Sequence, residues 1–152
     1  MQRLLPPSLV ALLVIAMVVA TLAVRWPELP TAMRVAGVVV LTGGMVLNVR
    51  HAKLFDSVGT NIKTFDDPDQ LVTTGAFAFT RNPMYLGFAL MLVGIALALG
   101  SVVAWLGPVI FVIAADRWYI PFEERRMRAV FGIDYDNYHA SVKRWFGRGG
   151  TP

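Results

Sequence analysis

The chain has 152 residues, of which 56% are hydrophobic and only 16% are charged, and it contains no cysteine. This length predicts one domain, and the hydrophobic fraction is high for a soluble globular protein. The absence of cysteine excludes a disulfide framework, a thiolate metal site and a cysteine nucleophile.

Three stretches lack Lys, Arg, Asp and Glu, and they cover residues 4–24, 35–49 and 82–115. A helix needs about 20 apolar residues to cross a bilayer. The third stretch is too long for one crossing, and Gly100-Ser101 interrupts it, so it predicts two helices. The sequence therefore predicts an all-α integral membrane protein, a single membrane domain over 1–152. The expected spans are roughly 5–24, 32–49, 83–99 and 102–120.

The first span starts like a secretory signal peptide, because Gln2-Arg3 precedes its apolar stretch. However, no small-residue cleavage site precedes a polar mature start. Arg25-Trp26-Pro27 instead resembles an interfacial stop, with Trp at the level of the headgroups. We expect this helix to be retained as a span.

The distribution of basic residues predicts the orientation in the membrane. Residues 117–148 contain seven Lys or Arg against four acids, and the connection 49–82 contains Arg50, Lys53, Lys63 and Arg81. Positive charge favours the cytoplasmic side, although Arg25 and Arg34 oppose the trend. With four spans, both termini are expected in the cytoplasm, as in a multi-pass protein of a bacterial inner membrane. Anionic headgroups explain the basic tail better than nucleic acid does.

Two polar segments flank the last pair of spans. The segment from Phe55 to Phe79 is longer than a simple connector, and loops of that kind are often functional. After the fourth span, Pro121 is expected to end or kink the helix. Residues 121–146 then predict short cytoplasmic helices, one over 122–131 with Gly132 after its end, and one from an Asp134 cap to about Trp145.

A basic turn, Arg81-Asn82-Pro83-Met84-Tyr85-Leu86-Gly87, opens the third span. One interpretation is an ordinary helix start, because Asn caps helices and Pro favours their first position. Arg81 is then a juxtamembrane charge and Tyr85 an interfacial aromatic. The alternative is a binding site, favoured by the concentration of these residues beside Gly75 and Gly87.

A second polar group, Asp116, Arg117, Glu123 and Glu124, lies at the end of the fourth span. If the two spans form a hairpin, this group meets the Arg81–Tyr85 turn. Asp116 and Glu123 are seven residues apart, as are Arg117 and Glu124, so each pair is expected to share a helix face. Charges at a membrane boundary are costly unless they are paired or functional. A structural ion pair and a ligand site both remain open.

A family resemblance is carried by several segments in order. They are Leu71-Val72-Thr73-Thr74-Gly75, Arg81 to Gly87, Glu123-Glu124, Phe131-Gly132, Tyr135, Tyr138 and Val142-Lys143-Arg144-Trp145. This set resembles the isoprenylcysteine carboxyl methyltransferase-like family, which is related to the phospholipid methyltransferases. The resemblance covers roughly residues 50–146. Some members have His at the position of Asn82, so a titrating base is not available there.

The resemblance implies a membrane methyltransferase that uses S-adenosylmethionine and acts on a lipophilic molecule or lipid reached from the bilayer. It implies catalytic roles for Arg81 and Glu124. The implied cofactor-binding residues are Leu71, Val72, Gly75, Arg81, Asn82, Tyr85, Glu123 and Glu124. The acceptor atom, a carboxylate, thiol or amine, stays open, and so does the oligomeric state.

Two alternatives remain. A membrane reductase of the sterol-reductase type would bind NADPH, whose 2′-phosphate favours a denser basic pocket. A small membrane scaffold would need no ligand at all. The sequence shows no metal-ligand spacing and no glycine-rich nucleotide loop, and His51 and His139 are isolated histidines. We therefore expect no metal, and any cofactor pocket is expected to be built from helices.

Overall fold

The computed structural model describes residues 4–24, 29–58 and 70–149. Most of the chain in these ranges is helical, and an antiparallel bridge between Val142 and Arg148 is isolated rather than part of a strand. Arg25-Trp26-Pro27 and most of the polar segment before Gln70 fall outside the described residues. The helices run in chain order as α1 Pro6–Ala23, α2 Thr31–Val58, η1 Gly75–Ala78, α3 Pro83–Leu99, η2 Val102–Trp105, α4 Leu106–Ala114, η3 Ala115–Tyr119, α5 Ile120–Phe131 and α6 Ile133–Ser141.

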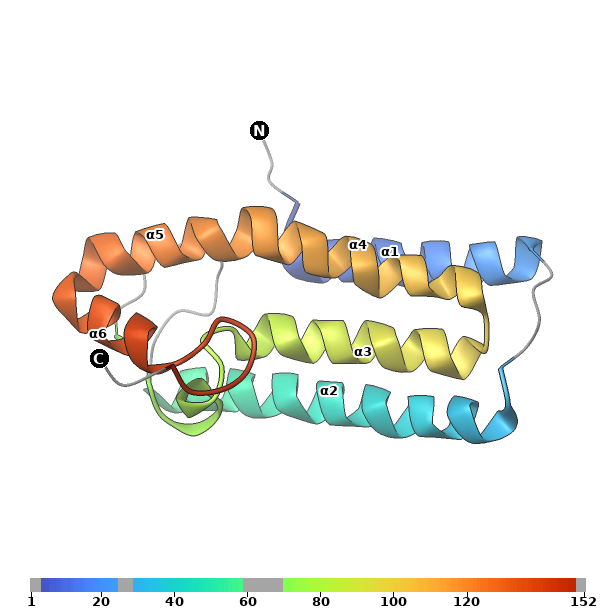
Figure 1. The fold of residues 1–152 in the computed structure, drawn as a ribbon, viewed down its shortest axis with the longest axis horizontal. Coiled ribbons are helices and arrows are strands. Elements are labelled where there is room, and N and C mark those ends of the chain that lie inside the picture. The colour runs from blue at the N-terminus through green and yellow to red at the C-terminus, as the bar shows by residue number, and fades with distance from the viewer. Residues whose placement is uncertain (1–3, 25–28, 59–69, 150–152) are drawn as a thin grey trace.

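The helices lie side by side as an elongated bundle (Figure 1). Among the described residues, three helical stretches are long and apolar enough to cross a membrane: Pro6–Ala23, Thr31–Leu54 and Val102–Phe131. α3 is also apolar but has only 17 residues. At 1.5 Å per residue it is about 26 Å long, slightly less than a typical hydrocarbon core. The all-α membrane fold expected from the sequence is confirmed.

The helix that begins after Gly100 is longer than expected. It runs without a break through α4, η3 and α5, and η3 is a turn of π-helix. The prediction that Pro121 ends this span is therefore wrong, because the helix continues to Phe131. In a regular α-helix the ring of Pro121 would clash with the carbonyl group four residues earlier. The wider π turn lies directly before Pro121 and relieves this constraint.

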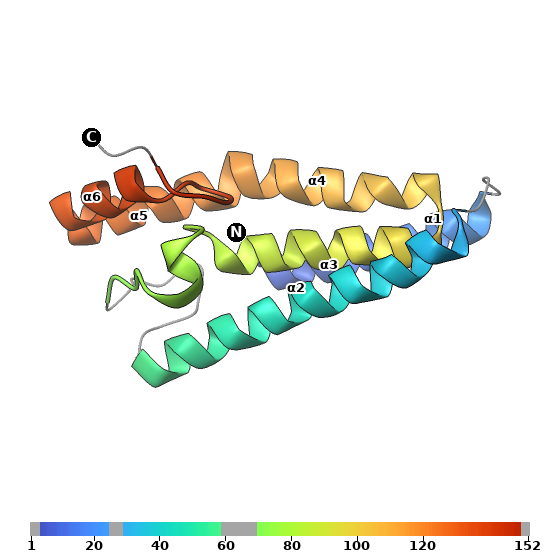
Figure 2. The same ribbon diagram turned by 60° about the horizontal axis from the view of Figure 1, so that its bottom comes forward.

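Glycines allow α2 and α3 to pack backbone against backbone. A Cβ atom at Gly37 would lie 2.7 Å from the carbonyl oxygen of Gly94, and one at Gly44 would lie 2.6 Å from that of Gly87. Small residues favour close helix packing in membranes. Gly43, next to Gly44 in sequence, has open space around its Cβ position. α2 and α3 thus pack tightly side by side (Figure 2), and α1 packs against α3 and α4.

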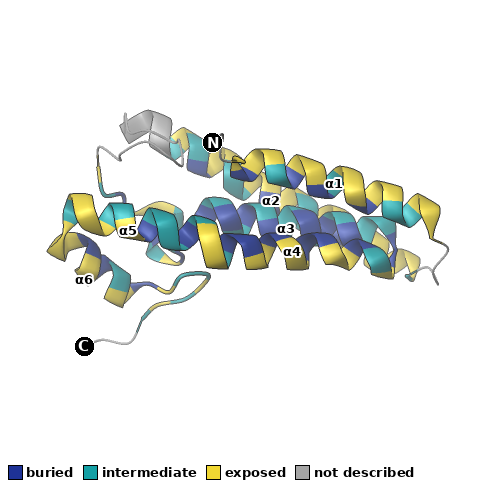
Figure 3. Ribbon diagram, turned by 90° about the horizontal axis from the view of Figure 1, so that it is seen from above, coloured by how far each residue is buried: buried dark blue, intermediate teal, exposed yellow. Residues whose placement is uncertain are grey.

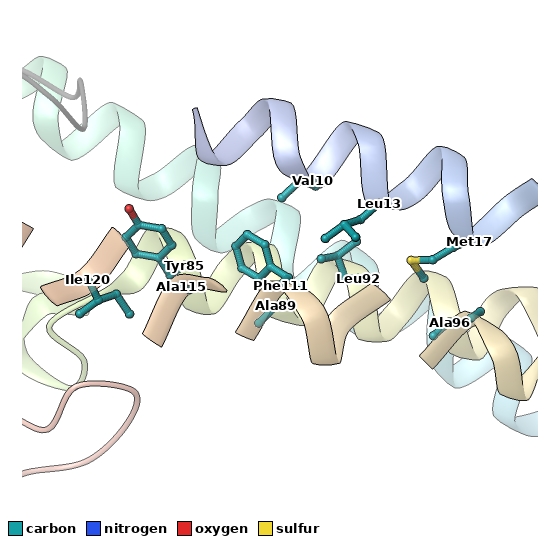
Figure 4. Close-up of a cluster of buried hydrophobic side chains, with 11 residues drawn as sticks. Val10, Leu13, Met17, Tyr85, Ala89, Leu92, Ala96, Phe111, Ala115 and Ile120 are labelled. Carbon is teal, nitrogen blue, oxygen red and sulfur yellow. The ribbon is translucent and has the colours of Figure 1, made fainter. Parts of the chain in front are cut away.

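The main core lies between α1, α3 and the helix that contains α4 (Figure 4). Tyr85, Leu92, Phe111 and Ile120 are almost fully buried there, and Met17 contributes from α1. The outward faces of α1 and α2 are largely exposed and apolar (Figure 3). In a membrane protein, such faces contact lipid.

A second, smaller cluster lies beyond the beginning of α3. It consists of Val72, Phe77, Tyr135, Tyr138 and Val142. α6 ends at Ser141, so the helix predicted to reach Trp145 is four residues too long. It also begins directly after Gly132 rather than at an Asp134 cap, because Gly132 has a φ of +52° that separates it from α5.

The close approach of α2 and α3 predicts different effects at two neighbouring glycines. Gly44→Ala places a methyl group against the Gly87 carbonyl and is expected to destabilise the protein by about 1–3 kcal/mol, the usual cost of overpacking. Gly43→Ala adds the same methyl group in open space, so it is expected to be neutral or slightly stabilising. Thermal unfolding of both variants in detergent measures the difference, and equal midpoints would contradict the observed packing.

Candidate functional site

The Arg81 side chain is buried beneath the C-terminal residues, with 8% of its surface exposed. Its Nη2 donates to Glu124 Oε1 at 2.8 Å. Its Nη1 donates to the backbone carbonyl of His139 at 2.9 Å and to that of Val142. The remaining donor, Nε, is buried and has no acceptor among the described residues. Arg81 therefore joins α5 to the C-terminal residues and keeps one buried donor for another group.

Glu124 receives a second guanidinium group from Arg144. Arg144 donates to both carboxylate oxygens of Glu124, from Nη2 at 2.7 Å and from Nε at 3.3 Å. Its Nη1 also donates to Asp116 Oδ1 at 3.0 Å. We refer to Arg81, Asp116, Glu124 and Arg144 as the ionic cluster. Its two arginines and two acids are matched in charge, so the cluster can lie against apolar helices without leaving an unpaired buried charge.

Asn82 does not cap α3. Its side chain makes no capping hydrogen bond, and its Nδ2 instead donates to the carbonyl oxygen of Arg144 at 3.0 Å. The Thr80 hydroxyl donates to the same oxygen at 3.2 Å. Pro83 does occupy the start of α3, as an ordinary helix start would have it. Asn82 thus fixes the backbone at Arg144 and positions that arginine over Glu124.

Residues 142–149, which we call the C-terminal loop, turn back along the residues before α3. Arg81 N–H donates to the Lys143 carbonyl at 3.1 Å, and Gly147 N–H donates to that of Phe79 at 2.7 Å. The loop closes on itself through the bridge between Val142 and Arg148. Its tip reaches back toward the junction of α4 and α5 (Figure 2). The loop is therefore held at the level of the first turn of α3.

A second acidic contact lies beside the ionic cluster. The hydroxyl of Tyr85 donates to Glu123 Oε1 at 2.7 Å. The ring of Tyr85 is 1% exposed and stacks on Tyr119, with ring centroids 6.1 Å apart. The Tyr119 hydroxyl in turn donates to the carbonyl oxygen of Leu4 at 2.8 Å. The beginning of α1 is thereby tied to the same end of the bundle.

The π turn determines which acids face this site. A π turn takes about one residue more than an α turn, so residues that share a face across it are about eight apart instead of seven. Asp116 and Glu124 are eight apart, and Arg144 contacts both. Arg117 and Glu124 do not share a face, because the Arg117 side chain is 77% exposed and that of Glu124 is 10% exposed. The expectation that a seven-residue spacing places two residues on one face is therefore wrong for Arg117 and Glu124.

The three cofactor-binding residues expected before Arg81, Leu71, Val72 and Gly75, lie in or next to the second cluster. Val72 is buried in the second cluster, and Leu71 packs against that cluster. Gly75 begins η1 with a φ of +63°, a conformation that favours glycine. The second cluster also contains Val142, whose carbonyl group accepts from Arg81. These residues support the C-terminal loop beside the ionic cluster.

Arg144 and Trp145 were not predicted as members of the site. Arg144 belongs to the ionic cluster, and the Trp145 Nε1–H donates to Asp116 Oδ1 at 3.2 Å. Asp116 was predicted to lie beside the Arg81–Tyr85 turn, but its contacts with Arg144 and Trp145 were not. Arg144 and Trp145 did occur in the segments that carry the family resemblance. Their roles depend on the C-terminal loop folding back, which no local sequence pattern indicates.

The two histidines and the acids give the described residues little capacity for acid–base or metal chemistry. The His139 imidazole has a lowered pKa because of burial and the nearby charge of Arg81, so it is mostly neutral at pH 7. His51 is buried, with its ring centroid 5.3 Å from that of Phe77. The described residues contain no group of three or more His, Asp or Glu placed to hold a metal ion. The chemistry available here is recognition by guanidinium, carboxylate, amide and phenol groups.

Comparison with known proteins gives a consistent family. Residues 32–134 match the phospholipid methyltransferase family. A Haemophilus influenzae protein of uncharacterised function is 39% identical over 62 residues, which is 41% of this chain and 98% of that protein. Two rice proteins, from Oryza sativa subspecies indica and japonica, are named probable protein-S-isoprenylcysteine O-methyltransferase. Each is 32% identical over 81 residues, 51% of this chain but only 41% of the rice protein. No solved structure matches.

The ionic cluster predicts unequal effects for two arginines on opposite sides of the π turn. Arg144→Gln removes charged hydrogen bonds to Glu124 and Asp116 and is expected to cost about 1.5–3 kcal/mol of stability. Arg117→Gln removes the same charge from an exposed side chain and is expected to change stability by less than about 0.5 kcal/mol. Thermal unfolding in detergent tests this pair. A larger loss for Arg117→Gln would be incompatible with the cluster.

Proposed function

The chain belongs to the phospholipid methyltransferase family, and on that premise we propose that it transfers a methyl group from S-adenosylmethionine to a lipophilic acceptor in the membrane. The observation that carries this proposal is the ionic cluster itself. It combines two arginines and two acids at the end of a set of apolar spans, where charges are costly unless paired or functional. The cluster also contains a buried donor, Arg81 Nε, that has no acceptor among the described residues.

The residues present fit the cofactor in their chemistry. S-adenosylmethionine carries a carboxylate, an ammonium group, a sulfonium centre and ribose hydroxyls. Arg81 has a free buried donor and a planar guanidinium suited to a carboxylate. Glu123 and Glu124 suit the cationic groups and the hydroxyls. We assign these three residues, with Asn82 and Tyr85, to the cofactor, and Leu71, Val72 and Gly75 to the wall that supports the C-terminal loop.

The proposed mechanism relies on positioning. When bound, S-adenosylmethionine would supply a methyl carbon activated by its sulfonium: the acceptor's lone pair would form a bond to that carbon in line as the carbon–sulfur bond breaks, with S-adenosylhomocysteine as the leaving group. Arg81 and Glu124 hold the donor side in a fixed orientation, since both are already held by the C-terminal loop. Placing reacting atoms about 3–3.5 Å apart supplies much of the acceleration in such reactions. The buried rings of Tyr85 and Phe111 exclude water beneath the cluster.

The acceptor is proposed to arrive from the bilayer, because the apolar helices end directly at the ionic cluster. A carboxylate or thiolate acceptor needs no base, and an amine needs only to arrive deprotonated. The names of the rice relatives favour a carboxylate on a prenylated cysteine. A phospholipid amine or a lipid thiol remains an alternative that product analysis distinguishes.

Two other functions are weighed against this one. A reductase using NADPH would need several free basic groups for the 2′-phosphate, whereas in the ionic cluster Arg81 Nε is the one buried donor without an acceptor among the described residues. A scaffold without a ligand would explain the ion pairs but not the buried, unpartnered Arg81 Nε. Both alternatives are resolved by the binding experiment below.

We propose that the ionic cluster and both termini face the cytoplasm. The exposed Arg50 and Lys53 of α2 lie at the same end of the bundle as the C-terminal loop. Reporter fusions after residue 149 and at Arg50 are expected to give a cytoplasmic signal, whereas a fusion at Pro30 is expected to give none. A cytoplasmic signal at Pro30 would overturn this orientation.

Binding of the methyl donor is the direct test of the proposal. Calorimetric titration of the detergent-purified protein is expected to show binding of S-adenosylmethionine and of S-adenosylhomocysteine, and none of NADPH. Glu123→Gln is expected to weaken binding by about 1.5–3 kcal/mol, the scale of a hydrogen bond to a charged group.

Asp136→Asn is the matched control, because Asp136 pairs with Arg128 on the surface at the same end of the molecule. It is expected to leave affinity unchanged. Glu123 is a cleaner choice than Glu124, whose loss would also break two ion pairs. Absence of S-adenosylmethionine binding, or binding of NADPH instead, would refute the proposed function.

A further inference from the structure

The C-terminal loop has an inward and an outward side. Val142, Arg144 and Trp145 are buried or half-buried and contact the site. Lys143, Phe146 and Arg148 are exposed, and Phe146 is 71% exposed. A large exposed aromatic side chain between two exposed basic residues is unexplained by the packing of the site.

A second pair of exposed basic and aromatic residues lies in the π turn η3, which the C-terminal loop contacts. Trp145 donates to Asp116, so Phe146 follows a residue that contacts η3. Within η3, Arg117 has 77% of its side chain exposed, and Trp118 is 68% exposed. We refer to the exposed aromatic and basic residues of these two linked segments, Arg117, Trp118, Lys143, Phe146 and Arg148, as the rim patch.

The rim patch continues the lipid-facing side of α4. Leu106, Val109, Ile110 and Ile113 are exposed along that helix, and Arg117 and Trp118 follow them in sequence on the outer side of the π turn. The patch also lies at the boundary of the apolar spans, because Asn82, next to the first residue of α3, donates to the carbonyl group of Arg144. Trp and basic residues at this level are typical of the interface between hydrocarbon and headgroups.

We propose that the rim patch docks the C-terminal loop onto the membrane surface, with Phe146 and Trp118 inserted among the acyl chains and Arg117, Lys143 and Arg148 bound to anionic phospholipid headgroups. The occupant is the lipid surface because the patch follows the exposed apolar side of a helix that is long and apolar enough to cross a membrane. Its charge is complementary to an anionic leaflet, which attracts basic residues near a span. Because Arg144 is in the same loop, docking also holds Arg144 against Glu124.

The absence of cysteine in the sequence allows a direct test with a single spin label. Phe146→Cys is labelled in vesicles of phosphatidylcholine alone or mixed with phosphatidylglycerol, and the label's access to oxygen and to a water-soluble nickel complex is measured. Ile133→Cys is the control, since Ile133 is also 71% exposed. Ile133 follows α5, whose twelve residues extend about 18 Å beyond η3, so its label is expected in water.

The label at 146 is expected to be several-fold more accessible to oxygen than to nickel, and to move deeper when phosphatidylglycerol is present. The double variant Arg117→Gln, Lys143→Gln is expected to abolish that lipid-dependent shift. A label at 146 that is as accessible to nickel as the label at 133 overturns the proposal.

If Phe146→Cys does not fold, quenching of the native protein by brominated lipid provides the measurement. Trp118→Phe is expected to lower the quenching by lipid brominated near the headgroups, and unchanged quenching overturns the proposal. Neither measurement requires methyl transfer or cofactor binding. Failure of the rim patch and failure of the proposed function are therefore separate results.

Discussion

One carboxylate, that of Glu124, is shared by two guanidinium groups that come from distant parts of the chain. Arg81 precedes α3, Arg144 follows α6, and Glu124 lies on the helix between them. Removing one partner from a buried pair of this kind usually costs several kcal/mol, because the remaining charge stays buried. The three segments therefore hold one another in place. The C-terminal loop, the turn before α3 and the first half of α5 are one unit for this electrostatic reason.

The apolar helices fix the position of that unit at one end of the bundle. The α2–α3 hairpin is fixed by glycines that allow direct backbone contact, so the position of Arg81 relative to the spans is well determined. α1 is tied to the same end through Tyr119 and Leu4. Polar recognition groups thus lie directly at the end of apolar helices. This arrangement suits a protein in which a water-soluble molecule and a lipophilic one have to meet.

The membrane fold and the contact between the Arg81 turn and the Glu124 segment could be predicted from sequence. The other contacts of the site could not. Long uncharged stretches report helices because burial in lipid requires them. Arg81 and Glu124 were predicted to be neighbours because a hairpin must bring its ends together, and the structure does join them. Arg144 was not predicted as their partner. It lies more than sixty residues after Arg81 in the sequence, and it reaches Glu124 only because the C-terminal loop folds back. The pairing of Asp116 was missed because a π turn leaves no clear sequence signal.

The π turn also has a consequence for comparing this chain with its relatives. The helix from Val102 to Phe131 contains one extra residue at η3. Residues on one face of the helix therefore follow the usual spacing before η3 and after it, but the spacing across η3 is one residue longer. A relative without that residue would keep both faces of the helix and still differ by one position in numbering. Equivalent acids in the two proteins would then be matched only by an alignment with a single gap between Ala115 and Ile120.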